Sequence, residues 1–188
     1  APSKKGELGT IELNKKLQLA LNPNEDNSEE MTINGKTFRK GDKVMQVKNN
    51  YDIPWFKENG DTGAGIFNGD IGILESVSRK NNMIKVVFDD KTAVYDKDNA
   101  IDLDFAYACT VHKSQGNEFE AVIIPMFKGA PQLYYRNLLY TAVTRAKKLL
   151  ILVGNVQTVE FMVQNNRRSK RYSGLREFLI RSRNEQVF

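Results

Sequence analysis

The sequence predicts an α/β domain that is interrupted by a small β-barrel of SH3-like size. Two observations support this prediction. Between residues 43 and 95, several short strand-like stretches are separated by tight-turn residues, a pattern typical of a small barrel. After Asp104, strand patterns alternate with helix patterns, which is typical of a parallel sheet. With 188 residues, of which 40% are hydrophobic, the chain is long enough to bury a core.

The first predicted element is a helix at residues 10–21. Leu13, Leu17 and Leu21 recur every four residues and would form one apolar stripe. Thr10 is suited to the start of the helix, and Asn22-Pro23 is suited to its end. The sequence therefore predicts an amphipathic helix that ends just before an acidic, polar stretch.

The strands predicted for the barrel are short and end at turn residues. They span residues 43–47, 71–77, 83–88 and 93–95. Residues 79–82 and 89–91 supply good turn chemistry between them. Residues 49–65 are expected to form a long functional or mobile loop that carries the aromatic residues Tyr51, Trp55 and Phe56.

The elements predicted after Asp104 alternate between strand and helix. They are a strand at 105–109, a strand at 121–124, a helix at 132–146, a strand at 149–153 and two closing helical segments with Val159, Met162 and Val163, then Leu175, Phe178 and Leu179. The strands at 121–124 and 149–153 are continuous apolar runs. Such runs are typical of strands that are covered on both faces, so a parallel sheet is expected here.

Composition excludes several classes of protein. Cys109 is the only cysteine and His112 the only histidine, which leaves no internal disulfide and no obvious zinc site. No apolar run is long enough to span a bilayer, and the first eight residues do not resemble a signal peptide. We therefore expect a reduced, cytoplasmic protein without a membrane partner. The start at Ala1, without Met, indicates a segment of a longer chain.

Positive charge is compatible with a nucleic-acid partner. The net charge is +5 and the isoelectric point is about 9.2. Residues 167–183 contain seven Lys and Arg residues against one Glu. This basic segment is either a solvated helix or a surface that meets a phosphate backbone or an acidic partner.

The segment Thr110-Val-His-Lys-Ser-Gln-Gly-Asn-Glu-Phe119 lies between two predicted strands. Thr110 is suited to cap a short helical turn, and Gly116 to the left-handed conformation that ends one. Polar side chains would then gather at one sheet edge, where open α/β sheets bind ligands. They belong to Thr110, His112, Lys113, Gln115 and Glu118.

A second segment, Tyr140-Thr-Ala-Val-Thr-Arg-Ala-Lys147, belongs to the predicted helix at 132–146. Asn137, Thr141 and Arg145 are spaced by four residues, so they share one helix face, opposite the apolar one. This spacing places a guanidinium near the end of the helix. An arginine that reaches a neighbouring γ-phosphate stabilises transition-state charge in nucleotide hydrolysis.

These two segments resemble motifs V and VI of superfamily 1 helicases. Together with further stretches they are similar to the RecD-like branch, named for the α subunit of exodeoxyribonuclease V. The further stretches are Gly41-Asp-Lys-Val-Met-Gln46, Phe67-Asn-Gly-Asp70, the start at Ala1-Pro-Ser-Lys-Lys-Gly6 and Arg171-Tyr-Ser-Gly-Leu-Arg176. The resemblance covers nearly the whole chain. It implies a second RecA-like domain of the P-loop NTPase type, formed by residues 1–65 and 105–188, with residues 66–104 as an SH3-like insert.

The resemblance also implies the roles of the site residues. Arg145 would be the catalytic arginine that contacts the γ-phosphate of ATP. Further ATP contacts would come from Gln115, Gly116 and Glu118, with Glu118 near the ribose. Contacts to single-stranded DNA would come from Asn49, Asn50, Thr110, His112, Lys113 and Thr141. Relatives in this branch move 5′ to 3′ along single strands and act in recombination and repair.

The sequence lacks a Gly-rich loop ending in Gly-Lys-Ser/Thr and an acidic Walker B strand. We therefore expect ATP and Mg²⁺ to be held mainly by an N-terminal RecA-like domain of the same protein, and the chain alone to hydrolyse no ATP. Lys4 and Lys5 stand where relatives present an arginine, and lysine lacks the bidentate fork of arginine. Other subunits of a nuclease–helicase complex are further expected partners.

Two other functions stay open at this stage. One is the helicase part of a conjugative relaxase, which shares these motifs. The other is a nucleic-acid-binding module without a motor role. Purely structural roles also stay open for single residues. His112, Asn49 and Asn50 could be turn residues, Arg145 a cation favoured at a helix end, and Glu118 a solvated charge. The aromatic residues could pack the loop onto the barrel or stack on nucleobases; they are Tyr51, Trp55, Phe56 and Phe67.

Overall fold

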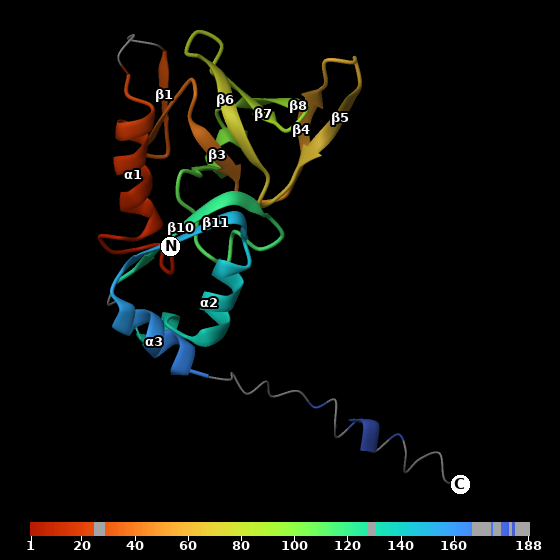
Figure 1. The fold of residues 1–188 in the computed structure, drawn as a ribbon. Helices are drawn as coiled ribbons and strands as arrows, with labels where there is room; N and C mark the ends of the chain where they lie inside the picture. Colours follow the sequence, from red (N-terminus) through yellow and green to blue (C-terminus); the bar gives the residue numbers. More distant parts are fainter. Residues whose placement is uncertain (25–28, 128–130, 167–173, 175–177, 181, 183–188) are drawn as a thin grey trace.

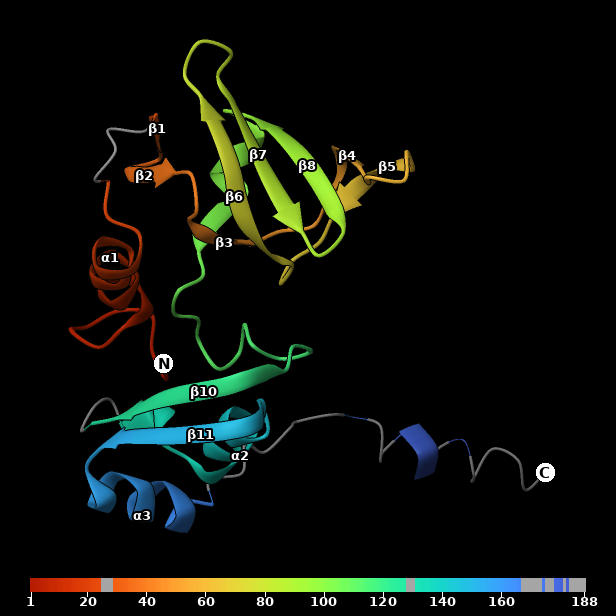
Figure 2. The same ribbon diagram turned by 45° about the horizontal axis from the view of Figure 1, so that its top comes forward.

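The computed structural model describes residues 1–24, 29–127, 131–166, 174, 178–180 and 182. A helix and a hairpin precede an antiparallel barrel, and a parallel α/β unit follows it (Figures 1 and 2). In chain order the elements are α1 (Thr10–Leu21), β1 (Glu30–Ile33), β2 (Lys36–Arg39), β3 (Lys43–Gln46), β4 (Asn50–Phe56), β5 (Thr62–Ile66), β6 (Ile71–Ser78), β7 (Met83–Phe88), β8 (Lys91–Asp96), η1 (Asn99–Asp102), β9 (Leu103–Phe105), β10 (Phe119–Met126), η2 (Pro131–Leu133), α2 (Arg136–Val143), β11 (Ala146–Gly154) and α3 (Val156–Gln164).

Helix α1 has the predicted limits, but its most buried side chains are polar. Asn14 and Gln18 are buried, whereas Leu21 of the predicted apolar stripe is exposed. The Asn14 amide nitrogen donates to the carbonyls of Phe105 (3.1 Å) and Ala108 (3.0 Å), and its oxygen accepts from the Ala108 backbone nitrogen at 2.7 Å. Buried backbone groups need partners. The helix therefore supplies the partners that a neighbouring strand would otherwise give.

The barrel is one antiparallel sheet in the order β5-β4-β8-β7-β6-β3-β9. Alternate residues of these strands point inward, and the buried set includes Val44, Leu74, Ile84 and Tyr95, each with no exposed surface. Burial raises the pKa of the Tyr95 hydroxyl, which donates to Gln46 Oε1 at 3.0 Å. The predicted strands between residues 43 and 95 all belong to this sheet.

Residues 49–65 are not the predicted long loop, because most of them form the hairpin β4–β5. Trp55 pairs with Gly63, and a Cβ on Gly63 would lie 2.4 Å from Cζ2 of the Trp55 ring. Glycine is therefore required for the indole to cross the neighbouring strand. The sequence pattern did not indicate this strand because it contains Pro54, and a proline within a stretch of residues argues against a regular strand. The register shift between Asn50 and Pro54 shows where the strand accommodates it.

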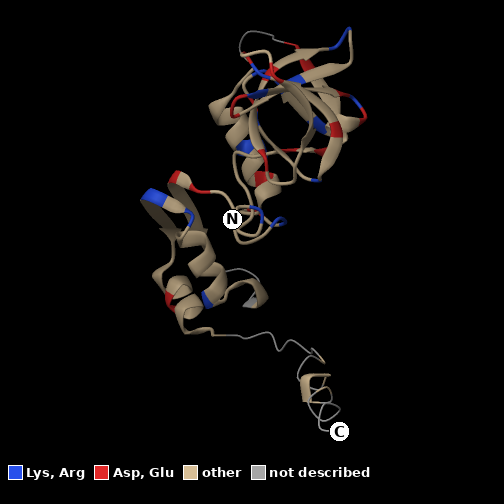
Figure 3. Ribbon diagram, turned by 90° about the vertical axis from the view of Figure 1, so that its right-hand side faces the viewer, with Lys and Arg blue, Asp and Glu red and all other residues tan. Residues whose placement is uncertain are grey.

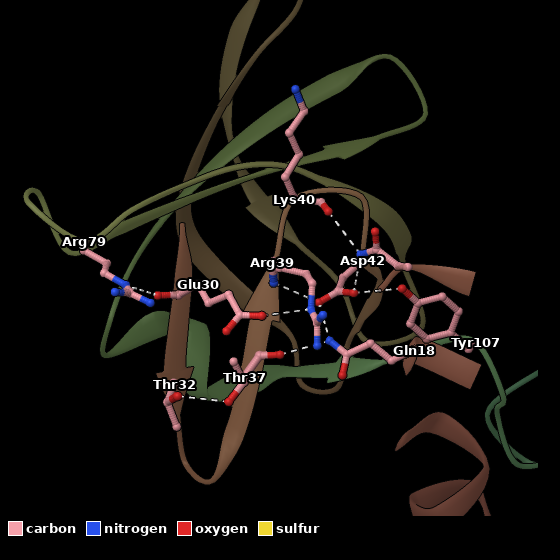
Figure 4. Close-up of polar contacts among 10 residues, drawn as sticks. Gln18, Glu30, Thr32, Thr37, Arg39, Lys40, Asp42, Arg79 and Tyr107 are labelled. Atoms are coloured by element: carbon pink, nitrogen blue, oxygen red, sulfur yellow. Dashed lines mark hydrogen bonds and ion pairs between the residues drawn. The ribbon is translucent and has the colours of Figure 1, made fainter. Parts of the chain in front are cut away.

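A buried carboxylate joins α1, the barrel and the segment that leaves the barrel. Asp42 has no exposed surface, and it accepts hydrogen bonds from Gln18 Nε2 (2.7 Å), Asn22 Nδ2 (2.8 Å), the Tyr107 hydroxyl (2.8 Å) and the Arg39 backbone nitrogen (2.9 Å). Figure 4 shows Gln18, Arg39 and Tyr107 converging on this residue. Burial, and then the bond to Asp42, raise the pKa of the Tyr107 hydroxyl. Four donors together hold this carboxylate in place.

Strands β10 and β11 pair in parallel, and α2 and α3 lie on one side of them (Figure 2). The expected cover on both faces is therefore absent within the described residues. Leu149 is 51% exposed and Ile123 is 65% exposed, while Ile124 and Met126 pack towards the helices. The apolar runs still favoured the correct element type, since β10 and β11 contain both predicted strands.

Two predicted elements after Asp104 have wrong limits. The strand expected at 105–109 ends at Phe105, because the following backbone is bonded by Asn14 rather than by a strand. The helix expected at 132–146 is shortened to α2, since β11 already begins at Ala146. The helical segment expected to begin at Leu175 lies partly outside the described residues, as does most of the basic segment 167–183.

None of the helices in the described ranges is both long and apolar enough to cross a membrane.

Replacing Asp42 by Asn is expected to lower the free energy of unfolding by about 3 kcal/mol. The new NH2 group would point at hydrogen-bond donors, and those buried donors would no longer have an acceptor. Urea unfolding followed by circular dichroism measures this change. Asp98→Asn, at an exposed turn position, is the matched control and should be nearly neutral. Equal effects of the two substitutions would contradict a central role for Asp42.

Candidate functional site

Residues 110–117, called the turn segment below, connect the barrel to β10 through successive tight turns. The Thr110 hydroxyl accepts from the Lys113 backbone nitrogen at 3.3 Å, as its predicted capping role requires. The buried Ser114 hydroxyl donates to the Val111 carbonyl at 2.8 Å, and Val111 is buried as well. Gly116 has a φ of +88°, the left-handed conformation predicted for it. The turn segment is thus anchored inside and presents its polar side chains outside.

Most of the sequence-predicted residues of the turn segment face outward. His112, Gln115 and Gly116 are exposed, as is Glu118 just after the segment, and nothing lies within 4 Å of a Cβ built on Gly116. Glu118 lies 3.6 Å from Lys147 Nζ in an exposed ion pair. Such a pair contributes little to stability, so Glu118 can exchange partners at small cost.

Lys113 belongs to a group of three lysines at the start of the turn segment. Burial lowers the pKa of Lys113, and the neighbouring charges of Lys4 and Lys36 lower it further, while Asp104 acts in the opposite direction. Lys36 itself is paired with Asp104, at 3.0 Å. The half-buried ammonium of Lys113 is therefore in a place where an incoming anion would stabilise its charge.

Arg145 follows α2 and is held by neutral acceptors. Its Nη1 donates to the Asn117 carbonyl (3.1 Å), its Nε to the Thr141 carbonyl (3.3 Å) and its Nη2 to the Thr144 hydroxyl (3.4 Å). The Arg145 carbonyl accepts from the Phe119 backbone nitrogen at 2.8 Å. Within the described ranges no carboxylate forms an ion pair with this half-buried guanidinium. Its positive charge is therefore available to an anion.

Thr141 lies one helical turn before Arg145, as the spacing predicts. Its hydroxyl donates to the Asn137 carbonyl at 2.8 Å, and the side chain is half-buried. The structure therefore brings Thr141 and Arg145 next to the end of the turn segment.

Asn117 is a residue of this site that sequence reasoning did not single out. Its Nδ2 donates to the Gly69 carbonyl at 3.3 Å, while its own carbonyl accepts from Arg145. Among the described residues, this is the one direct hydrogen bond between the barrel and the segment 110–166. The signal in the sequence was Gly69 beside Asn68, a turn dipeptide, but no spacing rule pairs it with Asn117.

The β5–β6 turn, residues 67–70, brings Asn49 towards the same place. The Asn49 side-chain oxygen accepts from the Asn68 backbone nitrogen at 2.9 Å, and the Gly69 nitrogen donates to the Gln46 carbonyl at 2.9 Å. Asn50, by contrast, is used inside the barrel. Its side chain donates to Asn99 Oδ1 at 3.0 Å and accepts from the Asp52 nitrogen at 3.0 Å.

Charge is distributed differently in the two parts of the chain. Figure 3 shows Lys and Arg interspersed with Asp and Glu around the barrel, and few charged residues on α2 and α3. In the described part of the chain, no three His, Cys, Asp or Glu side chains are placed to hold a metal ion. The half-buried cations of the site, Lys113 and Arg145, are the groups that can contact an anion.

Comparison with known families divides the chain into two matches. Residues 13–88 match the family described as the ATP-dependent RecD-like DNA helicase SH3 domain. Residues 105–153 match the UvrD-like helicase C-terminal domain. The second match contains the turn segment and Arg145, and the first contains most of the barrel.

Curated relatives are similar over most of the chain. The ATP-dependent RecD2 DNA helicase of Deinococcus radiodurans is 30% identical over 169 residues, which are 90% of this chain and 21% of that protein. The RecBCD enzyme subunit RecD of Mycobacterium tuberculosis is 32% identical over 136 residues, 72% of this chain and 21% of that protein. The chain therefore spans about one fifth of the length of these relatives.

A solved structure shares the fold. The Pif1 helicase from Bacteroides, in complex with ADP-AlF3 and single-stranded DNA, superimposes with a TM-score of 0.53 at 18% identity. The match covers 94% of this chain and 44% of that one. It supports the RecA-like helicase fold with an SH3-like domain that the sequence predicted.

Replacing Asn117 by Asp should loosen the β5–β6 turn, because a carboxylate would face the Gly69 carbonyl in place of a donor. Hydrogen exchange followed by mass spectrometry should show amides at residues 66–71 exchanging about tenfold faster. Asn81→Asp makes the same charge change at an exposed barrel turn. If both variants protect residues 66–71 as well as the unmodified chain does, the bond from Asn117 does not hold this turn.

Proposed function

We propose that this chain, which belongs to the RecD-like superfamily 1 helicases, supplies the motif V and motif VI contacts of an ATP-dependent motor as its C-terminal, second RecA-like domain. The motor moves 5′ to 3′ on single-stranded DNA and acts in recombination and repair. One observation carries the proposal. Asn117 is bonded to Arg145 on one side and to Gly69 of the barrel on the other, so nucleotide-side and DNA-side residues form one hydrogen-bonded unit.

The nucleotide side consists of Arg145 with Gln115, Gly116 and Glu118. Among the described residues, the Arg145 guanidinium has only neutral acceptors, at 3.1 to 3.4 Å, which fits a group that turns to the γ-phosphate of ATP. Gly116 leaves open space beside the backbone, so a nucleotide can approach closely. The bound nucleotide supplies the phosphoryl group whose developing charge Arg145 stabilises.

The DNA side consists of Thr110, His112, Lys113, Asn49 and Thr141. Lys4 and Lys36 repel the charge of Lys113, and although Asp104 opposes them, that carboxylate is paired with Lys36, so Lys113 keeps a charge that a phosphate can neutralise. Neutralisation of backbone phosphates provides most of the affinity of sequence-independent binding. The side chain of Asn50 is already hydrogen-bonded to Asn99 and to the Asp52 nitrogen. Of the residues predicted on this path, it would therefore contribute to the DNA contact least directly.

We propose that the rest of the motor corresponds to the part of these relatives that the chain does not span, about four fifths of their length. We propose that an N-terminal RecA-like domain holds most of the phosphates and Mg²⁺, and that further subunits join in some assemblies, as the name RecBCD enzyme subunit says of the mycobacterial relative. The domain limits 1–65 with 105–188, and 66–104 for the insert, remain a prediction.

Replacing Arg145 by Ala in the full-length helicase should lower DNA-stimulated ATP turnover about 1,000-fold, because the γ-phosphate loses its cation. Binding to labelled single strands should persist. Lys148→Ala, which removes an exposed lysine paired with Glu120, is the control and should retain turnover. The isolated 188-residue chain should hydrolyse no ATP. Normal turnover by the Arg145 variant would refute the motif VI assignment.

Replacing Lys113 by Ala should weaken binding to single strands of any sequence to a similar extent, because one phosphate contact is lost. In a titration at several salt concentrations, the slope of log affinity against log salt should become shallower by about 0.7. Lys97→Ala, at an exposed barrel turn, is the control. An unchanged slope for the Lys113 variant would show that this lysine does not meet a phosphate.

A further inference from the structure

Two aromatic side chains stand exposed beside the β5–β6 turn. Tyr51 is 67% exposed and Phe67 is 43% exposed, and their rings meet edge to face with centroids 5.6 Å apart. We call them the ring pair. Trp55 on the same hairpin behaves differently, because it packs against the barrel core and carries the ammonium of Lys91 4.8 Å above its ring. The ring pair, by contrast, is exposed, so packing in the core does not explain why both residues are aromatic.

The backbone is built to hold these rings in place. Gly65 has a φ of +107°, and a Cβ there would lie 3.4 Å from Cζ of Phe67. The Phe67 nitrogen donates to the Asp70 carboxylate at 2.8 Å, and the Asp70 nitrogen donates to the Phe67 carbonyl at 3.0 Å. The Asp70 charge is thus used within the turn. Phe67 sits on a closed, hydrogen-bonded turn rather than on a free loop.

The same turn connects the ring pair to the proposed DNA side. Asn68 and Gly69 follow Phe67 directly, and they bond to Asn49 and Asn117 respectively. Asn117 belongs to the turn segment that carries His112. The ring pair is therefore continuous with residues proposed to meet the sugar–phosphate backbone.

We propose that Tyr51 and Phe67 form a stacking site for one unpaired nucleobase of the bound single strand. The proposal rests on the proposed function. The two rings, beside the turn whose Asn68 nitrogen donates to Asn49, make an apolar spot of two side chains, whereas surfaces that dock proteins need larger contiguous patches. Every nucleobase has a flat face that can stack on an aromatic ring, whichever of the four bases it is. Such a site therefore suits a motor that moves along strands of any sequence.

The test is a binding cycle between protein rings and DNA bases, carried out with the full-length helicase. Affinities are measured for a labelled oligothymidylate and for an abasic strand of the same length. Phe67→Ala should weaken binding to the oligothymidylate about tenfold, with little change for the abasic strand. Phe67→Leu should behave as Phe67→Ala, and Phe67→Tyr should restore binding, because the ring matters rather than the apolar volume. Tyr51→Ala should show the same selective loss.

Phe56→Ala is the matched control, since Phe56 lies on the same hairpin with 42% of its surface exposed. It should affect neither strand. Equal losses of Phe67→Ala on both strands, or full affinity of Phe67→Leu for the oligothymidylate, would overturn the stacking site and leave the proposed function standing. Failure of the unmodified helicase to bind single strands at all would overturn the proposed function itself.

Discussion

The arrangement of this chain depends on the need to satisfy buried polar groups where three stretches of backbone meet. Asp42 accepts hydrogen bonds from Gln18 of α1, from the backbone nitrogen of Arg39 at the end of β2 and from the hydroxyl of Tyr107, so it joins the helix and the barrel to the stretch before the turn segment. An uncompensated carboxylate at this depth would be costly, and so would its unpartnered donors. The junction is therefore formed as a whole or not at all, and the barrel acquires a defined orientation relative to the start of the turn segment.

Asn117 performs the corresponding task at the other end of the turn segment. Through Gly69 it reaches the barrel, and through its carbonyl it reaches Arg145. Because the turn segment is held at both ends, a movement of the Arg145 guanidinium can shift Asn117 and, through it, the β5–β6 turn of the barrel without any large rearrangement. In the proposed motor, this arrangement would give a physical basis for coupling ATP hydrolysis to DNA movement, because coupling requires contacts that both sites alter.

Much of the fold could be predicted from local patterns. Helix α1 and strand β7 have the predicted limits, since the period of their apolar residues and their flanking turn residues agree. Non-local effects escaped prediction. Asn14 and Gln18 are buried because backbone groups far along the chain need partners, and hairpin β4–β5 was hidden by Pro54 and the bulge before it. In the site, Thr110 and Gly116 have the predicted local conformations. The contact between Asn117 and Gly69 arises only when the barrel folds back.

The bonds of Asn14 also bear on the order in which the chain acquires its structure. Asn14 is satisfied by Ala108, 94 residues later, and the whole barrel lies between them. During synthesis, α1 emerges before the barrel but stays without these partners until the barrel strands and the residues after Phe105 have been made. Contacts this distant in sequence form slowly, because a long loop must close first. Within the barrel, the hairpins β4–β5, β6–β7 and β7–β8 join strands that are consecutive in sequence, so they are expected to form early, and α1 is expected to dock last.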